Sequence, residues 1–338
     1  MLYLAKTESI PENIKLSNPK GNHNQFAGDV LEGLNSFPKQ LSSKYFYNEE
    51  GDKLFQEIMH LEEYYLTRSE FEIFSMQKDD ILKIFSEGGK KFKLIEFGAG
   101  DGLKTKVLLK HFLEKEADFE YVPIDISANV LEDLSRSLEE ELPELEVEPI
   151  AADYFKGLEQ LNKHDDGARK VVLFLGSNIG NFSHHEATIF LQQISKAFDE
   201  DDLLFLGADL RKDPQVILDA YNDKRGVTKA FNLNLLKRIN EELGANFQLE
   251  KFSHFPIYDP QSGSCKSYIV SLADQKVYIE ALGKTIQFDA HETIHTEVSQ
   301  KYSVKELGNI AKASGFEIDN VLYDCKHYYT DLVLKKAN

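Results

Sequence analysis

Lys93-Leu-Ile-Glu-Phe-Gly-Ala-Gly-Asp-Gly-Leu-Lys-Thr-Lys106 is the stretch of this sequence that decides the fold. Its apolar run ends in closely spaced glycines and continues into a helical pattern, which predicts a strand, a tight turn and a helix N-terminus where the backbone can approach a ligand. A second apolar run, Tyr121-Val-Pro-Ile-Asp-Ile-Ser127, contains Asp125 at its end. Because an acidic side chain at the tip of the neighbouring strand can accept hydrogen bonds from a ribose, the two segments together predict a nucleoside-binding site.

The spacing of the glycines narrows the class of nucleoside. A dinucleotide fingerprint requires Gly-x-Gly-x-x-Gly. The glycines of this turn are Gly98, Gly100 and Gly102, so the third one lies one position too early. The turn instead resembles the first motif of class I S-adenosylmethionine (SAM) methyltransferases, in which an acidic residue precedes the glycines. Similar turns occur in α/β proteins without ligands, but Asp125 and Asp153 at the following strand ends favour a methyltransferase over that alternative. The missing third glycine disfavours a nicotinamide-dependent oxidoreductase.

The composition is that of an acidic globular protein. Of its 338 residues 42% are hydrophobic and 28% charged, and the excess of Asp and Glu over Lys and Arg gives a formal charge of −18. This charge argues against nucleic acid or an anionic membrane as a partner. No apolar run approaches the ~20 residues of a transmembrane helix, and the N-terminal apolar stretch is far too short for a signal peptide. We therefore expect a cytoplasmic monomer that acts on a small molecule.

The two cysteines, Cys265 and Cys325, indicate no special chemistry. Two cysteines do not make a disulfide framework, and neither has a His or Cys at metal-ligand spacing. We expect ordinary reduced thiols and no metal cofactor.

Strand and helix patterns alternate through the middle of the chain. The predicted elements are helix 69–86, strand 93–97, helix 104–116, strand 121–126, helix 128–141, strands 147–151 and 170–175, helix 185–198 and strand 203–207. Repeated units of this length predict a parallel sheet with right-handed crossovers. The carboxyl ends of its strands share one edge, where ligands bind in open α/β sheets; this edge carries Gly98, Asp125, Asp153, residues 178–181 and Asp209.

The pattern changes after Asp209. We expect helices at 214–221 and 227–243, alternating strands that include 267–271 and 276–280, and then a helix at 304–314 with strands from 316 and at 331–334. An antiparallel hairpin of these last two strands would resemble the end of the class I methyltransferase sheet. The N-terminal part is polar and turn-rich, with a short helix around 29–34. The predicted fold is a class I methyltransferase (Rossmann-like) doubly wound α/β sheet with a smaller α+β domain. Residues 69–211 plus 302–338 would bind SAM, and residues 12–68 plus 212–301 would bind the substrate.

Five further segments resemble one family over nearly the whole chain, the histidine-specific N-α-methyltransferases of ergothioneine biosynthesis. They are Leu41-Ser-Ser-Lys-Tyr-Phe-Tyr-Asn48, Glu62-Glu-Tyr-Tyr-Leu-Thr-Arg-Ser-Glu70, Phe174-Leu-Gly-Ser-Asn-Ile-Gly-Asn-Phe182, Ala220-Tyr-Asn-Asp-Lys-Arg-Gly-Val-Thr-Lys-Ala-Phe-Asn232 and Thr296-Glu-Val-Ser-Gln-Lys-Tyr302. Members trimethylate the α-amino group of histidine to hercynine, using three SAM molecules and releasing S-adenosylhomocysteine (SAH). The resemblance implies the same activity here.

On the cofactor side, the resemblance implies contacts from Gly98, Gly100 and the rest of their turn, from Lys104, from Asp125 on the ribose, and from Asp153 with Tyr154 around the adenine. Simpler interpretations exist for two of these residues. Lys104 could be a solvated lysine, although a cation in a first helical turn opposes the helix dipole and is easier to explain beside a carboxylate, here the methionine tail. Asp153 could be an ordinary helix N-cap.

On the amino-acid side, the resemblance assigns Tyr64, Asn181 and Tyr221 to the α-amino and α-carboxylate groups. Tyr47, Glu297 and Ser299 would face the substrate side chain. Phenol and amide groups can orient a zwitterion, and an ionised Glu297 can accept a hydrogen bond from an imidazole N–H. Without the surrounding motifs, core packing would explain Tyr64 and Tyr65, and Glu297 would be a strand residue facing water.

The sequence departs from the family at one position of the substrate pocket. The family strand that corresponds to 266–270 typically offers a methionine to the substrate side chain, and this chain has Ser267 there. The pocket would then be roomier or more polar than is usual. Tyrosine, tryptophan or a larger histidine derivative stays an alternative substrate, and a non-catalytic SAM-binding protein is an alternative function.

The chemistry implied is an in-line displacement at a sulfonium methyl group. The enzyme would hold a neutral amine opposite the leaving sulfur, so Asn181 and Tyr47 are the candidate catalytic residues. No His or Cys of the motifs is an evident general base. Tyr47 could relay the proton, and loss of the proton to solvent before the site closes is equally compatible with the sequence.

Overall fold

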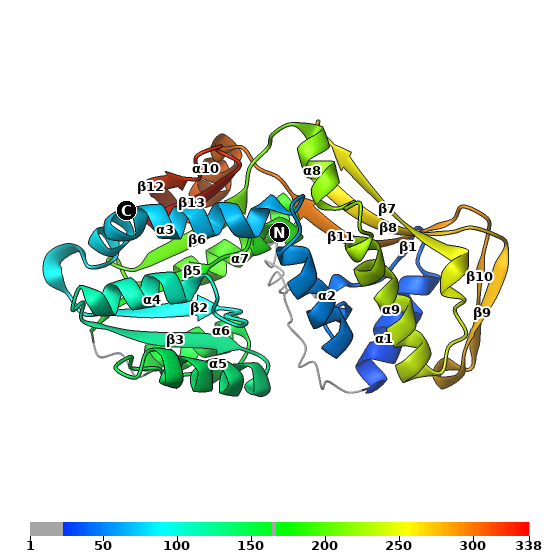
Figure 1. The fold of residues 1–338 in the computed structure, drawn as a ribbon, viewed down its shortest axis with the longest axis horizontal. Helices are drawn as coiled ribbons and strands as arrows, with labels where there is room; N and C mark the ends of the chain where they lie inside the picture. Colours follow the sequence, from blue (N-terminus) through cyan, green and yellow to red (C-terminus); the bar gives the residue numbers. More distant parts are fainter. Residues whose placement is uncertain (1–22, 164–166, 338) are drawn as a thin grey trace, which may run out of the picture.

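The computed structural model describes residues 23–163 and 167–337 and contains two lobes, each built around its own sheet (Figure 1). The larger sheet has seven strands in the order β12-β13-β6-β5-β2-β3-β4. These strands are β2 (Phe92–Phe97), β3 (Phe119–Asp125), β4 (Ile150–Ala151), β5 (Arg169–Phe174), β6 (Leu203–Asp209), β12 (Phe316–Tyr323) and β13 (Tyr329–Lys336). β2 to β6 are parallel, whereas β13 runs antiparallel to both β6 and β12. This is the predicted doubly wound sheet with its terminal hairpin.

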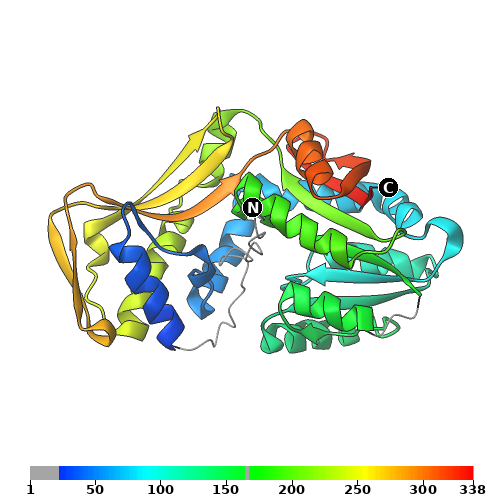
Figure 2. The same cartoon turned by 180° about the vertical axis from the view of Figure 1, so that it is seen from behind.

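Helices cover both faces of this sheet. One face packs against α3 (Tyr65–Phe85), α4 (Thr105–Glu114) and α5 (Ala128–Glu141). The other packs against α6 (Tyr154–Lys163), α7 (His184–Ala197) and α10 (Val304–Ala313), and Figure 2 shows α7 and α10 from that side. Every residue of β2 and of β6 is buried, because a parallel sheet between two layers of helices has no face toward water.

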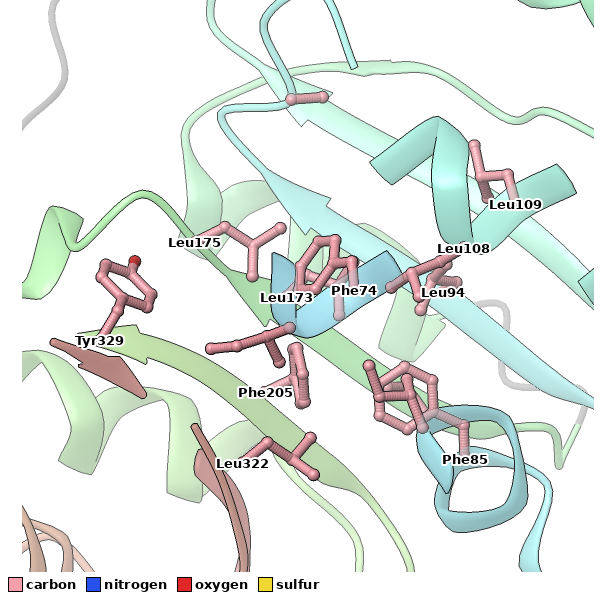
Figure 3. Close-up of a cluster of buried hydrophobic side chains, with 14 of the residues drawn as sticks. Phe74, Phe85, Leu94, Leu108, Leu109, Leu173, Leu175, Phe205, Leu322 and Tyr329 are labelled. Atoms are coloured by element: carbon pink, nitrogen blue, oxygen red, sulfur yellow. The ribbon is translucent and has the colours of Figure 1, made fainter. Parts of the chain in front are cut away.

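Aromatic and aliphatic side chains fill the layer under α3 and α4 (Figure 3). Phe85 of α3 meets Phe205 of β6 edge to face, with ring centres 5.3 Å apart. Phe74 lies 6.0 Å from the same ring. This packing holds α3 across the sheet, so that the N-terminal end of α3 stays at the edge where the strands end.

The smaller lobe contains a four-stranded sheet in the order β1-β11-β8-β7 and a separate β9-β10 hairpin. Its strands are β1 (Lys39–Gln40), β7 (Phe252–Asp259), β8 (Ser264–Ser271), β9 (Gln275–Ile279), β10 (Lys284–Phe288) and β11 (Thr293–Gln300). The helices are α1 (His23–Asn35), α2 (Glu49–Met59), α8 (Pro214–Ala220) and α9 (Val227–Leu243). β8 alternates buried and half-buried residues, which is the pattern of a sheet packed on one side only.

Most predicted elements are present, with differences at their ends. α9 has the predicted bounds, and α5 is capped by Ser127, whose Oγ accepts a hydrogen bond from the backbone of Val130. α3 begins at Tyr65 rather than at residue 69, and α6 was not predicted. β4 is shorter than predicted, because Pro149 lacks the N–H that a strand ladder needs. The helix expected at 29–34 is the longer α1.

The chain passes between the lobes before α3, after β6 and again after β11, and the last two connections run side by side. Leu210 and Tyr302 form a parallel bridge. The Arg211 N–H donates to the Tyr302 carbonyl at 2.8 Å, and the Tyr302 N–H donates to the Asp209 carbonyl at 2.9 Å. The predicted domain boundaries stay a prediction, and residues 12–22 of the substrate domain lie outside the described residues. Within the described ranges, no helix combines the length and the apolar character needed to cross a membrane.

Candidate active site

The turn after β2 presents bare backbone at the sheet edge. Gly98 and Gly100 have φ angles of 67° and 56°, which favour glycine. The Gly98 N–H donates to the Ile124 carbonyl at 2.9 Å and fixes the turn against β3. A Cβ atom at Gly98 would lie 3.0 Å from the Tyr154 hydroxyl. Gly98 therefore keeps the space between the turn and Tyr154 free of a side chain.

Glu96 stabilises the turn through buried hydrogen bonds. It is 4% exposed and accepts hydrogen bonds from Thr105 Oγ1 at 2.7 Å and from the Tyr121 hydroxyl at 2.5 Å. Burial raises the pKa of Glu96 to about 7, although both hydrogen bonds act in the opposite direction. The acidic residue before the glycines thus ties the start of α4 to β3.

Lys104 pairs with a carboxylate of the protein itself. Its ammonium contacts the buried Glu70 of α3, so the solvated-lysine alternative is wrong. Glu70 Oε1 also accepts from the Gly176 N–H at 2.9 Å and from the Tyr329 hydroxyl at 2.8 Å. The Lys104 side chain is 21% exposed, which leaves part of it accessible to a ligand. Its contact with a SAM carboxylate stays a prediction.

Asp125, Asp153 and Tyr154 lie on the strand ends next to the turn. Asp125 accepts from the Ser127 N–H at 2.9 Å, and burial raises its pKa. Asp153 accepts from the Lys156 N–H at 3.0 Å, which is the geometry of the helix N-cap that the sequence also allowed. Its contact with adenine stays a prediction.

The Tyr154 ring stacks on Phe97, with centres 4.5 Å apart and planes 5° apart. This stacking fixes the ring beside Gly98. We call Gly98, Gly100, Lys104, Asp125, Asp153 and Tyr154 the cofactor side of the site.

The residues that the resemblance assigns to the amino-acid substrate lie among aromatic side chains. Tyr47 packs edge-on against Phe55 with ring centres 5.6 Å apart, and Tyr64 packs edge-on against Tyr221 at 6.5 Å. Glu297 is half-buried, and burial raises the pKa of its carboxyl to about 7. We call Tyr47, Tyr64, Asn181, Tyr221, Glu297 and Ser299 the amino-acid side.

Tyr221 and Ser299 belong to a buried polar cluster. The Tyr221 hydroxyl donates to Ser299 Oγ at 2.8 Å. Lys301, which has no exposed surface, donates to both hydroxyl oxygens and to Asp209. Asp209 also accepts from Tyr65, and this fully buried carboxylate does not face a ligand as its position on the sheet edge suggested. It anchors the lysine under the amino-acid side.

Asn181 ends the short 3₁₀-helix η4 (Asn178–Asn181), which packs against the end of β11. The Tyr302 hydroxyl donates to the Ile179 carbonyl at 3.0 Å and holds η4 in place. A Cβ atom at Gly180 would lie 2.9 Å from the Gln300 carbonyl oxygen, so the two segments touch through bare backbone. η4 therefore brings Asn181, from the larger lobe, to the strand that carries Ser299.

The two sides face each other across the lobes. The Asp52 carboxylate of α2 adds to the rise in the pKa of Asp125. Burial raises the pKa of Tyr47, and Glu297, Asp52 and Tyr154 add to that rise. Such interactions need short distances, because water screens charges that lie far apart. The start of α2 thus lies near Asp125, and Tyr47, just before α2, lies near Glu297 and Tyr154.

Ser267 lies on the inner face of β8. It is 2% exposed and pairs with Glu297 in the register of β8 and β11, next to an irregularity between His295 and Glu297. Cys265 and Ile269 are buried on the same face. The contact of Ser267 with a substrate side chain stays a prediction.

Two hollows in the surface of the protein lie away from this site. One of about 430 Å³ and one of about 310 Å³ lie on other surfaces of the larger lobe, and no cofactor-side or amino-acid-side residue lines them. In the described part of the chain, Glu72, Asp324 and Cys325 are the one group with ligand atoms close enough to hold a metal. Asp324 already accepts from the Tyr328 and Tyr329 N–H groups, so it stabilises the turn before β13.

Sequence reasoning missed Glu70, Lys301 and Asp52. Glu70 and Lys301 lie at the ends of two quoted segments, but nothing in their spacing showed that they are buried and paired. A charged residue inside an apolar or motif-dense segment is the signal that could have marked both, because such residues are seldom buried without a partner. For Asp52, on an exposed helix, the sequence carries no such signal.

Comparisons with known proteins identify the family. Residues 26–336 match the model described as histidine-specific methyltransferase, SAM-dependent. A histidine N-alpha-methyltransferase of Mycolicibacterium smegmatis is 35% identical over 274 residues, 81% of this chain and 83% of that protein. The protein of the same name from Mycobacterium tuberculosis is 33% identical over 287 residues, 85% of this chain and 87% of that protein.

A third relative shares only part of its length with this chain. Ergothioneine biosynthesis protein 1 of Neurospora crassa is 31% identical over 292 residues, which are 83% of this chain but 31% of that protein. The family model covers most of the described residues, including both sides of the site. The chain therefore belongs to the SAM-dependent, histidine-specific methyltransferase family.

Proposed function

We propose that this protein transfers methyl groups from SAM to the α-amino group of free L-histidine, with hercynine as the product after three transfers. SAM supplies an electrophilic methyl group and leaves as SAH. The residues of the cofactor side suit that molecule. The Gly98 turn offers bare backbone, Asp125 offers a carboxylate for the ribose diol, and Lys104 keeps an accessible cation for the methionine carboxylate.

One observation carries the proposal for the substrate. The side-chain polar groups of Tyr47, Tyr64, Asn181 and Glu297 have no hydrogen-bond partner among the described residues, although these residues converge on one region. Tyr47 and Asn181 are exposed and Tyr64 and Glu297 are half-buried, so these polar groups are open to a ligand that enters the site. Two phenols, an amide and a carboxyl together match the groups of histidine: an α-amine, an α-carboxylate and a ring N–H.

In this proposal the residues of the chain act by positioning. Asn181 and Tyr64 orient the amine along the line of transfer, and Glu297 holds the ring so that the amine cannot turn away. The raised pKa of Tyr47 keeps its phenol protonated at neutral pH, so Tyr47 can pass a proton along but cannot hold a negative charge as a base. We propose that the amine loses its proton toward solvent before the lobes close on it.

The test is incubation of the protein with SAM and a panel of free L-amino acids, followed by mass spectrometry for successive methyl additions. We expect one, two and three additions to histidine, and no product when SAH replaces SAM. Methylated tyrosine or tryptophan with unchanged histidine would overturn the substrate and keep the reaction class, which the roomier position at Ser267 would then explain. SAM binding without consumption of any amino acid would favour a non-catalytic protein.

We also propose a cytoplasmic monomer. The acidic charge supports this proposal, since net charge keeps proteins apart in solution. Light scattering coupled to gel filtration would show a mass near 38.6 kDa for a monomer. A mass near a multiple of that value would contradict it.

A further inference from the structure

Lys301 is the most deeply buried cation beside the amino-acid side. Its side chain has no exposed surface, and its Nζ lies 2.7 Å from Asp209 Oδ2. Burial alone would lower the pKa of Lys301, but the neighbouring Asp209 carboxylate outweighs it and raises that pKa above the ordinary value. Lys301 therefore keeps its ammonium charge at neutral pH. This group can donate three hydrogen bonds and cannot accept any.

All three N–H bonds of Lys301 are used. One goes to Asp209, one to the Tyr221 hydroxyl at 2.8 Å and one to Ser299 Oγ at 2.7 Å. Ser299 Oγ also accepts the Tyr221 proton at 2.8 Å. A serine oxygen has two lone pairs, and both are then occupied. The Ser299 hydroxyl keeps one proton, for which the described residues provide no acceptor.

We propose that Lys301 is a positioning residue that fixes Ser299 as a hydrogen-bond donor and thereby makes the site select a ring with an unprotonated nitrogen. This inference rests on the proposed function, in which Ser299 and Glu297 face the substrate ring. Glu297 accepts from a ring N–H, and Ser299 donates to a ring lone pair. A neutral imidazole offers both groups at once. An imidazolium ion, an indole or a pyrrole offers no lone pair and leaves the Ser299 proton unpaired.

Lys212 provides a matched comparison within the same cluster. It is also held by Asp209, and it donates to the Tyr65 hydroxyl at 2.7 Å. It makes no hydrogen bond to Tyr221 or Ser299 in the described structure. Removing Lys212 therefore takes a cation from Asp209 without changing the lone pairs of Ser299, whereas removing Lys301 does both.

The first test compares the dissociation constants of L-histidine and of β-(pyrrol-3-yl)alanine, which keeps a ring N–H but lacks the second nitrogen. Calorimetric titration of the SAH-saturated protein should show the pyrrole analogue binding at least about tenfold more weakly, because a buried donor is left unpaired. In Lys301→Met the Ser299 oxygen regains a lone pair and its hydroxyl can rotate, so we expect the ratio to fall to about threefold or less. Lys212→Met should keep the ratio of the unchanged protein.

A retained tenfold ratio in a Lys301→Met protein that still binds SAH would overturn the proposal. Equal loss of the ratio in Lys212→Met would also overturn it, because the effect would then belong to the charge on Asp209. If Lys301→Met fails to fold, the unchanged protein still provides a test. Nitrogen NMR of ring-labelled L-histidine bound at neutral pH should show one protonated and one unprotonated ring nitrogen, and two protonated nitrogens would contradict the proposal.

The results separate this inference from the proposed function. A protein that binds L-histidine no better than other amino acids would contradict the proposed function and, with it, the role of Lys301. A protein that binds and methylates L-histidine but discriminates equally well with methionine at position 301 would contradict the role of Lys301 alone.

Discussion

The cofactor side and the amino-acid side each hold a lysine against a buried carboxylate, but the two lysines differ in what they can reach. Beside Glu70, the Lys104 side chain keeps 21% of its surface exposed. Lys301 has no exposed surface, and its three N–H bonds are all used. Lys104 can therefore touch a ligand directly, whereas Lys301 can influence one only through the hydroxyl groups that it holds.

The two sides also differ in how the chain builds them. The cofactor side comes from successive strand ends of one sheet, so its residues follow one another in the sequence. The amino-acid side combines residues just before α2 and α3, the residue after α8, and residues of β11 and η4, which come from both lobes. A change on the cofactor side should thus affect one ligand, while the amino-acid side depends on how the lobes meet.

Asn181→Ala should have the largest effect, because Asn181 comes from the larger lobe and yet is proposed to orient the amino acid. We expect kcat/KM for the amino acid to fall on the order of 100-fold, since a misplaced amine loses its line of attack. The affinity for SAM should stay nearly unchanged in a calorimetric titration. Asn309→Ala, at an exposed position of α10, is the matched control and should behave like the unchanged protein. Equal losses of SAM affinity and activity in Asn181→Ala would remove Asn181 from the amino-acid side.

Asp125→Asn tests the cofactor side alone. We expect the affinity for SAM to fall about tenfold, because a charge-assisted hydrogen bond to the ribose becomes a neutral one. Calorimetric titration with SAM measures this change. Asp133→Asn, on the exposed surface of α5, should leave the affinity unchanged. An unaltered affinity in Asp125→Asn would show that the ribose binds elsewhere.

Gly207→Ala tests the carboxylate that holds Lys104. A Cβ atom at Gly207 would lie 2.6 Å from the Tyr329 hydroxyl and closer still to Glu70. We expect a loss of about 1–3 kcal/mol in the free energy of unfolding, because both buried groups must move. The same substitution at Gly28, a helical position in α1 with open space around it, should instead stabilise the protein by about 0.5–1 kcal/mol. Chemical denaturation measures both, and a neutral Gly207→Ala would mean that Glu70 moves freely.

Glu96→Gln tests how the stability of the turn on the cofactor side depends on pH. Burial raises the pKa of Glu96 to about 7 in the folded state, above its ordinary value of 4.5. The folded protein then binds the proton more tightly, so the contribution of Glu96 is full below pH 4.5 and is lost as pH rises to about 7. Relative to the unchanged protein, Glu96→Gln should gain on the order of 3 kcal/mol between pH 4.5 and pH 8. Denaturation at both pH values measures the difference, and parallel changes in the two proteins would contradict the raised pKa.

The sequence predicted the strand, turn and helix that carry the cofactor side because their signals are local. The glycine spacing after β2 and the Ser127 cap of α5 depend on residues within a few positions of each other. The alternation of strands and helices likewise predicted the sheet and its hairpin. The predicted strand 147–151 is longer than β4, because Pro149 interrupts the strand in spite of the apolar residues around it.

The amino-acid side could be assigned only through resemblance. The Tyr221–Ser299 hydrogen bond and the Asp209–Lys301 ion pair join residues that lie far apart in the chain, and their distances depend on the lobe connections. The face on which Glu297 lies also depends on an irregular register in β11, which periodicity does not reveal. Composition and spacing therefore predict a nucleoside-binding turn, but they do not predict the residues of the amino-acid side.

Paired titrations of Asp125→Asn and Glu297→Gln test the division of the site most directly, with SAH alone and then with L-histidine at saturating SAH. We expect a crossed result: about tenfold weaker SAH binding with little change for histidine in Asp125→Asn, and the reverse in Glu297→Gln. Equal weakening of both ligands in both variants would contradict the account, because the two sides would then form one undivided binding surface.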